Sequence, residues 1–140
     1  MGLAAQAGRS WAASLVEFLT ICNWKTQRSE PLVAQNSAKE VERSTQEAIS
    51  SREEARRMEA LIELRGVGVP TASALLHFAY PESYPILDVR ALESLGCKGR
   101  SQYSVSFWVQ YVETCRRLAR QYGVTVRLLD KALWQHSKER

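Results

Sequence analysis

The sequence contains few of the residues that usually bind metals or crosslink a chain. Among its 140 residues are two histidines and three cysteines. Cys22, Cys97 and Cys115 are far apart and form no C-x-x-C pair, so they indicate neither a disulfide framework nor a four-cysteine metal cluster. His77 and His136 have no partner at ligand spacing, and we expect no metal site built from them. A reducing, cytoplasmic setting is the simplest interpretation.

Long apolar runs and alternating patterns are also missing. The run WAASLVEFLTIC is short and carries Glu17, which is typical of an amphipathic helix rather than of a signal peptide or a membrane span. We therefore expect no membrane partner. No run alternates between apolar and polar residues as a strand would, and there is no internal repeat of useful length.

The remaining composition describes an ordinary globular chain with a modest basic excess. An apolar content of 45% is enough for one core in 140 residues, so we expect a single domain spanning residues 1–140. Nineteen Lys and Arg against fifteen Asp and Glu give a net charge of +4. That charge fits a polyanionic partner and also fits many proteins without one.

Helical periodicity runs through most of the chain. Ser10 is expected to cap a first helix that extends to Cys22, and a long connection follows it. A second helix begins at Asn36 or Ser37, with Glu40 placed for a capping box. Further helices are expected over 51–65, 70–80, 89–95, 105–122 and 125–137. About seven helices with short links predict an all-α, compact bundle.

The segment RGVGV forms a sharp corner between two of these helices. Gly66 and Gly68 allow backbone conformations that a side chain would obstruct, and Val67 between them is expected to point inward as a packing plug. Their amide groups, with the start of the helix at Pro70, can bind an anion such as a phosphate. The alternative is a glycine-rich helix corner that binds no ligand.

The stretch LRGVGVPTASALLHFAYPESYPILDVRALESLG, residues 64–96, resembles the helix-hairpin-helix DNA glycosylase superfamily. The family pattern L-P-G-V-G-x-K-T-A is followed by a helix and by a V-D-x-x-V-x-R-x-x-x-L-G segment that carries a catalytic aspartate. Asp88 stands at that aspartate position. The residues that match the hairpin pattern are Leu64, Gly66, Val67, Gly68, Thr71 and Ala72.

Two departures from the family pattern limit the chemistry. Pro70 stands where bifunctional members have a nucleophilic lysine, and proline has no amine that could form a Schiff base. The cysteines of the cluster-bearing members are absent, and the chain is short for a full glycosylase of this type. The resemblance therefore implies a monofunctional member, with no lyase reaction by the lysine route.

The resemblance implies a DNA-binding hydrolase of base excision repair, a monofunctional DNA N-glycosylase. Asp88 would be catalytic, since a carboxylate beside the sugar ring stabilises the positive charge that develops as the base leaves. Asp88 can equally be a helix cap, and the two roles are compatible. The resemblance also implies that hairpin carbonyls can hold a monovalent cation, with no other cofactor. Contacts to the phosphate backbone of duplex DNA are assigned to Gly66, Val67, Gly68, Val69 and Thr71.

Other cations are candidates for DNA contact. In NWKTQRS, Trp24 stands near Lys25 and Arg28, a combination suited to stacking on a base while touching phosphates. General burial tendencies favour the alternative, in which Trp24 anchors a loop to the core. Arg90 can pair with Asp88, contact phosphate or lie on the surface. Trp134 is expected to anchor the last helix.

Two other functions stay open alongside the enzyme. One is a non-catalytic DNA-binding module on the same scaffold, and the other is a protein-interaction domain in which the corner is purely structural. A pocket facing Asp88 would separate the enzyme from the module. The base released, the strand preference and the oligomeric state do not follow from the sequence.

Overall fold

The computed structural model describes residues 14–26, 30–96 and 103–139 of the chain. These residues form eight helices and no strand, which confirms the all-α prediction. The helices are α2 (Leu15–Lys25), α3 (Glu30–Val33), α4 (Ala38–Ser50), α5 (Glu54–Ile62), α6 (Val69–Ala79), α7 (Val89–Ser94), α8 (Val105–Tyr122) and α9 (Val126–Glu139).

The N-terminal half departs from the expected boundaries at two places. Ser14 caps α2, because Ser14 and Glu17 form a capping box in which each side chain accepts from the other's backbone amide; Ser10, the predicted cap, lies outside the described residues. The long connection predicted after Cys22 is wrong: α2 continues to Lys25, and α3 follows it. The capping box of Ser37 and Glu40 at the start of α4 is confirmed.

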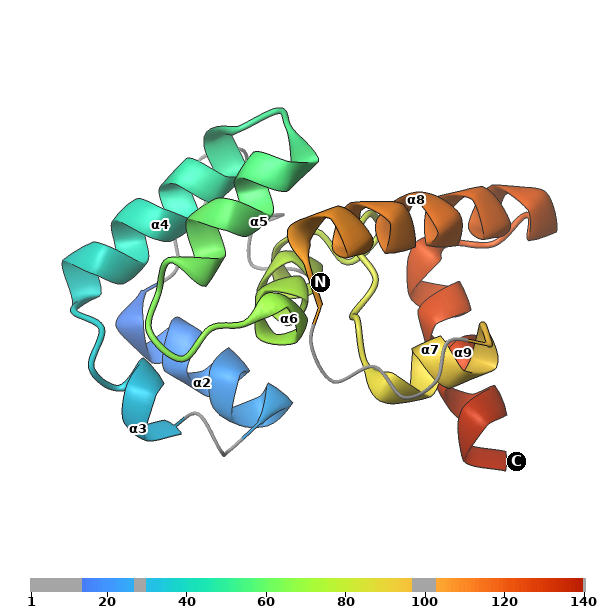
Figure 1. Ribbon diagram of the computed structural model, residues 1–140, viewed down its shortest axis with the longest axis horizontal. Coiled ribbons are helices and arrows are strands. Elements are labelled where there is room, and N and C mark those ends of the chain that lie inside the picture. Colours follow the sequence, from blue (N-terminus) through green and yellow to red (C-terminus); the bar gives the residue numbers. More distant parts are fainter. Residues whose placement is uncertain (1–13, 27–29, 97–102, 140) are drawn as a thin grey trace.

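The helices are arranged on two sides of a central helix, α6 (Figure 1). On one side, α4 packs along α5, and α2 packs on both α6 and α4. On the other side α7 packs on α9, and α8 connects the two sides because it contacts both α5 and α9. The segment between α6 and α7 crosses the middle of the molecule.

The core forms where the apolar faces of these helices meet. Phe18, Leu75 and Trp108 come from three different helices, and all are fully buried. The ring of Tyr84 stacks on Trp108 with 6.0 Å between centroids. Burial raises the pKa of the Cys22 and Cys115 thiols to about 12, so neither is a reactive nucleophile. Helical spacing correctly predicted the buried positions Val41, Thr45, Ala48, Ile49, Trp108, Tyr111 and Cys115.

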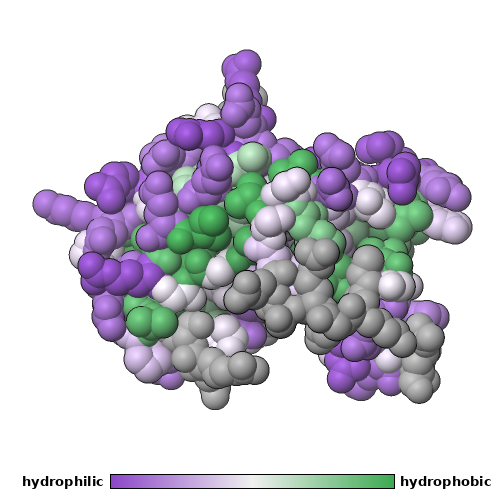
Figure 2. All heavy atoms as spheres, viewed as in Figure 1, coloured by the Kyte–Doolittle hydropathy of each residue, from purple (hydrophilic) through white to green (hydrophobic). Residues whose placement is uncertain are grey.

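Hydrophilic residues cover the outer surface of α4 and the far end of α8, while hydrophobic residues gather towards the middle of the face in Figure 2. In the described part of the chain, no helix combines the length and the apolar character needed to cross a bilayer.

Candidate functional site

The corner between α5 and α6 is closed around Gly66. This residue has φ of +78°, a left-handed conformation that side chains disfavour. A Cβ placed on Gly66 would lie 2.8 Å from Val33 Cγ1 and 2.9 Å from Leu32 Cβ, so α3 leaves no room for one. Val67 is buried, as predicted for the packing plug. The corner is thus a packed element of the core as well as a turn.

Asn36 holds the corner against α3. Its Nδ2 donates to the carbonyl oxygens of Arg65 (2.9 Å) and Val33 (3.0 Å), and its Oδ1 accepts from the amide of Arg65 (2.9 Å). The sequence indicated Asn36 only as the start of a helix. Its actual role depends on a contact across 29 residues, which local pattern cannot show.

The start of α6 differs from the rest of the corner because it is open. Gly68 is exposed at the N-cap, and it provides no side chain to satisfy the first amides of α6. An added Cβ there would meet only Pro70 Cδ, at 3.8 Å. The side chains of Val69 and Thr71 point into the core instead. Of the five predicted hairpin contacts, Gly68 is therefore the best placed for direct approach by a phosphate.

The segment after α6 turns back along that helix and leads to Asp88. His77 Nδ1 lies 2.8 Å from the carbonyl oxygen of Tyr84. Closer to the start of α6, the amide of Leu87 donates to Ser73 Oγ (2.8 Å), and this hydroxyl donates to the carbonyl oxygen of Pro70 (2.6 Å). Leu87 therefore lies beside the middle of α6, and Asp88 follows it.

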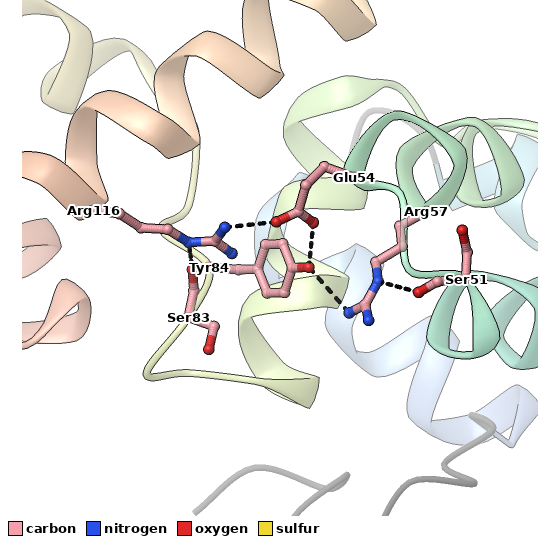
Figure 3. Close-up of polar contacts among 6 residues, drawn as sticks. All are labelled: Ser51, Glu54, Arg57, Ser83, Tyr84 and Arg116. Carbon is pink, nitrogen blue, oxygen red and sulfur yellow. Dashed lines mark hydrogen bonds and ion pairs between the residues drawn. The ribbon is translucent and has the colours of Figure 1, made fainter.

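A polar cluster holds the same returning segment from the other side (Figure 3). The hydroxyl of Tyr84 donates to Glu54 Oε1 (2.5 Å) and accepts from Arg57 (3.0 Å). Arg116 on α8 donates to Glu54 Oε2 (2.6 Å) and to the carbonyl oxygen of Ser83 (3.0 Å). The cluster fixes residues 83–84 between α5 and α8 and so restricts where Asp88 can lie.

Asp88 begins α7 as the cap that the sequence predicted. Its Oδ1 accepts from the amide of Ala91 at 2.9 Å, and its backbone is extended. This bond orients the carboxylate, which is only partly buried. Asp88 is therefore held in place and still reaches the surface of a cavity.

That cavity has a volume of about 760 Å³, within the usual size range for small-ligand sites. It lies between α2 and α6 on one side and α7 and α9 on the other. Four of its side chains are cationic, against two carboxylates, so its formal charge is positive. The lining residues are Trp24, Lys25, His77, Phe78, Ile86, Asp88, Arg90, Arg127, Asp130, Lys131, Trp134 and Gln135.

Two tryptophans at the cavity are more exposed than expected. Trp24 is 61% exposed and packs edge-on against Phe78, with 5.2 Å between ring centroids. Trp134 is 39% exposed, and the Arg90 guanidinium lies 5.4 Å from its ring centre. The contact with Phe78 ties Trp24 to α6, as expected of an anchor, while Trp24 stays largely exposed and open to a flat ligand. Arg90 and Lys138 both lie over the ring of Trp134.

The predicted cations have different outcomes. Lys25 ends α2 and lines the cavity, where burial lowers the pKa of its ammonium group and the charges of Asp88 and Asp130 oppose that shift. Arg90 is exposed, lines the cavity and stacks on Trp134. Arg28 lies outside the described residues.

Asp130 was not recognised from the sequence. Its Oδ2 accepts from the amide of Ile86 at 3.0 Å, and burial raises the pKa of its carboxyl group to about 6, with the charge of Asp88 adding to the rise. A signal was present: Val126, Leu129 and Leu133 mark the inner face of α9, and Asp130 follows the same spacing. A charged residue on an otherwise apolar face is the pattern that indicates such a site.

No protein-family model, curated protein or solved structure matches this chain. Within the described ranges, no three His, Cys, Asp or Glu side chains are grouped as metal ligands. The site is therefore interpreted from its own geometry: an oriented carboxylate, aromatic rings and cations around one cavity.

Proposed function

We propose that this protein binds DNA through the α5–α6 corner and acts as a monofunctional DNA N-glycosylase of the helix-hairpin-helix type. The observation that carries the proposal is the placement of Asp88. It caps α7, and it lines a cavity large enough for a nucleobase.

The corner and the cavity rim provide the contacts to the phosphate backbone. The exposed start of α6 at Gly68 presents backbone amides and the positive end of the helix dipole. Lys25, Arg90, Arg127 and Lys131 line the cavity and attract the same polyanion. Duplex DNA is the partner that uses both features at once.

The cavity provides the pocket for an extruded base. An enzyme that acts on a base within a duplex rotates the nucleotide out of the stack and places it in a pocket, usually between flat side chains. The exposed ring of Trp24 suits that role. Asp88 then lies beside the sugar, where its negative charge stabilises the cationic transition state and orients the attacking water.

Lyase chemistry at the family's lysine position is not part of this proposal. Pro70 occupies the first turn of α6 and has no amine, so the corner itself supplies no nucleophile for the abasic sugar. The expected product is an intact strand with an abasic site.

The test is a panel of duplexes that each contain one damaged or modified base, incubated with the protein and treated with alkali to cleave abasic sites. We expect cleavage on at least one duplex, and Asp88→Asn should reduce the rate at least 100-fold while binding is retained. Glu42→Gln on the exposed face of α4 is the matched control, and it should leave the rate unchanged. Full activity of Asp88→Asn would show that the mechanism is wrong.

A non-catalytic DNA-binding module is the second candidate. Asp88 Oδ1 already accepts the bond from Ala91, so Asp88 can serve as a cap alone. This candidate predicts affinity that falls steeply with salt and no product on any duplex. If no duplex or single strand binds even at low salt, a protein-interaction domain is favoured over both.

A further inference from the structure

The cavity contains a second carboxylate that the role assigned to Asp88 does not require. Asp130 lies on the inner face of α9 and lines the same cavity as Asp88 on α7. The chain has only two aspartates, and the fold brings both to one site from positions 42 residues apart. Two carboxylates in one cavity can have different tasks if their surroundings differ.

The surroundings of the two groups do differ. Asp88 accepts the capping bond at the start of a helix, where a negative charge is stabilised. Asp130 accepts one amide, from Ile86, through Oδ2. Among the residues that the structure describes, none donates a hydrogen bond to its Oδ1, which leaves this oxygen for a proton or a ligand.

The peptide at Ile86 keeps Asp130 in a fixed position. Its amide donates to Asp130 Oδ2 (3.0 Å), while its carbonyl oxygen accepts from the hydroxyl of Tyr111 (3.2 Å) on α8. The carboxyl group is thus positioned by two helices and by the segment that leads to Asp88. A fixed orientation is what a proton donor in the cavity requires.

Charged and titratable groups face Asp130 from the neighbouring helices, and together with burial they raise the pKa of its carboxyl group. Burial is the largest cause of its pKa of about 6, the charge of Asp88 adds to it, and Lys25 together with the amide of Ile86 opposes it. The groups around it are Lys25 of α2, His77 of α6, Asp88 at α7, Tyr111 and Cys115 of α8, and Arg127 and Lys131 of α9.

We propose that Asp130 is the general acid of the site, which protonates the base as it leaves while Asp88 stabilises the sugar cation. This inference rests on the proposed glycosylase function and adds a second catalytic residue to it. Asp88 then acts on the sugar as a carboxylate, and Asp130 acts on the base as a protonated carboxyl group.

Release of the base breaks the bond between C1′ and the base nitrogen. The electron pair of this bond goes to the base, which takes the proton of Asp130. Water adds to the C1′ cation and releases one proton to solvent. Asp130, now a carboxylate, takes a proton from solvent before the next turnover. The products are a neutral free base and an abasic sugar.

This role predicts a dependence on the leaving group. A neutral base, such as hypoxanthine or uracil, leaves with its electron pair as an anion unless it is protonated. A base that is already cationic, such as 7-methylguanine, leaves as a neutral molecule and needs no acid. Loss of Asp130 should therefore slow the release of neutral bases far more than the release of cationic bases.

The experiment measures single-turnover release from duplexes that contain one hypoxanthine, uracil or 7-methylguanine, with wild type and Asp130→Asn. The asparagine keeps an oxygen that can accept from the amide of Ile86. We expect the single-turnover rate of the variant to be at least 100-fold lower on each neutral base that the wild type releases, and less than fivefold lower on 7-methylguanine. Asp130→Glu, which restores a carboxyl group, should recover part of the loss.

The wild-type protein supplies an independent measurement that needs no variant. The rate of release of a neutral base should fall about tenfold per pH unit above a pH of about 6. The rate of release of 7-methylguanine should not show this decrease. Equal losses on all three bases in Asp130→Asn, or a wild-type profile that is the same for both kinds of base, would overturn the assignment of Asp130 alone. Absence of any base release by the wild type would instead overturn the glycosylase proposal, and the role of Asp130 with it.

Discussion

The corner at Gly66 and the cavity at Asp88 are stabilised in opposite ways. The corner is formed by backbone groups, a buried amide side chain and apolar contacts with α3. The cavity is lined by ionisable groups and by exposed aromatic rings. Substitutions at the packed positions of the corner, Gly66 and Asn36, should therefore affect mainly folding, whereas those in the cavity should affect mainly binding and chemistry.

The electrostatics of the cavity support this division. Burial lowers the pKa of Lys25 and raises that of Asp130, so both charged forms are disfavoured by the fold. Ionisable groups whose charged forms are disfavoured by burial are common in binding and catalytic sites. No comparable group is found in the described residues of the corner, where the polar atoms of Asn36 are bonded.

The largest effect is expected at Gly66. Gly66→Ala places a side chain in a left-handed conformation and against Val33, and it should lower the free energy of unfolding by about 4 kcal/mol. The matched control is Gly68→Ala, where a Cβ has open space and the cost should not exceed about 1 kcal/mol. Urea denaturation of both variants measures the difference. Equal stability of the two variants would show that the corner is not tightly packed.

The next largest effect is expected at Asn36. Asn36→Leu leaves the partly buried amide and carbonyl groups of Arg65 without their partners, which should cost about 2 kcal/mol in urea denaturation. Gln35→Leu, at the adjacent exposed position, should change stability by less than about 0.5 kcal/mol. A small effect at Asn36 would mean that α3 does not hold the corner.

The turn at Gly66 and the cap at Asp88 were predictable from the sequence because they depend on their own backbone or on near neighbours. The contacts of the corner with Asn36 and α3 were not, because they join distant segments. Periodicity likewise predicted most helices, since the apolar face of each helix is encoded within its own segment. The short helix α3 was missed because four residues carry no detectable period.

The cavity depends on contacts between distant segments, and such contacts leave a weaker signal. Asp130 bonds to a backbone amide 44 residues away, and no spacing rule connects those positions. Trp24 was expected to be buried because most tryptophans are, but α2 ends at the cavity and leaves its ring in solvent. What the sequence did contain was a single acidic residue on the inner face of α9.

A third effect concerns the pH dependence of stability. The pKa of Asp130 is about 6 in the folded protein against a reference value of 3.8, so between these values the folded state binds more protons than the unfolded state. Stability attributable to this group should fall as pH rises through that window and stay lower above it, by about 2 kcal/mol after allowance for partial exposure. Asp130→Asn should remove this component and be more stable than wild type at pH 7, as measured by urea denaturation from pH 4 to 8. If the difference in the free energy of unfolding between wild type and Asp130→Asn does not change with pH, the raised pKa of Asp130 is contradicted.

The smallest effect separates the two roles of Asp88, and it tests the division between corner and cavity most directly. Asp88→Ala removes the oxygen that accepts from Ala91 and should lower the free energy of unfolding by about 1 kcal/mol. Asp88→Asn keeps an oxygen at the same place, so its stability should stay within about 0.5 kcal/mol of wild type although its charge is lost. If base release is abolished in both variants while only Asp88→Ala is destabilised, then the charge serves the chemistry and the oxygen serves the helix. Equal destabilisation of the two would instead mean that the charge itself holds the start of α7, and that chemistry and folding are not separable at this residue.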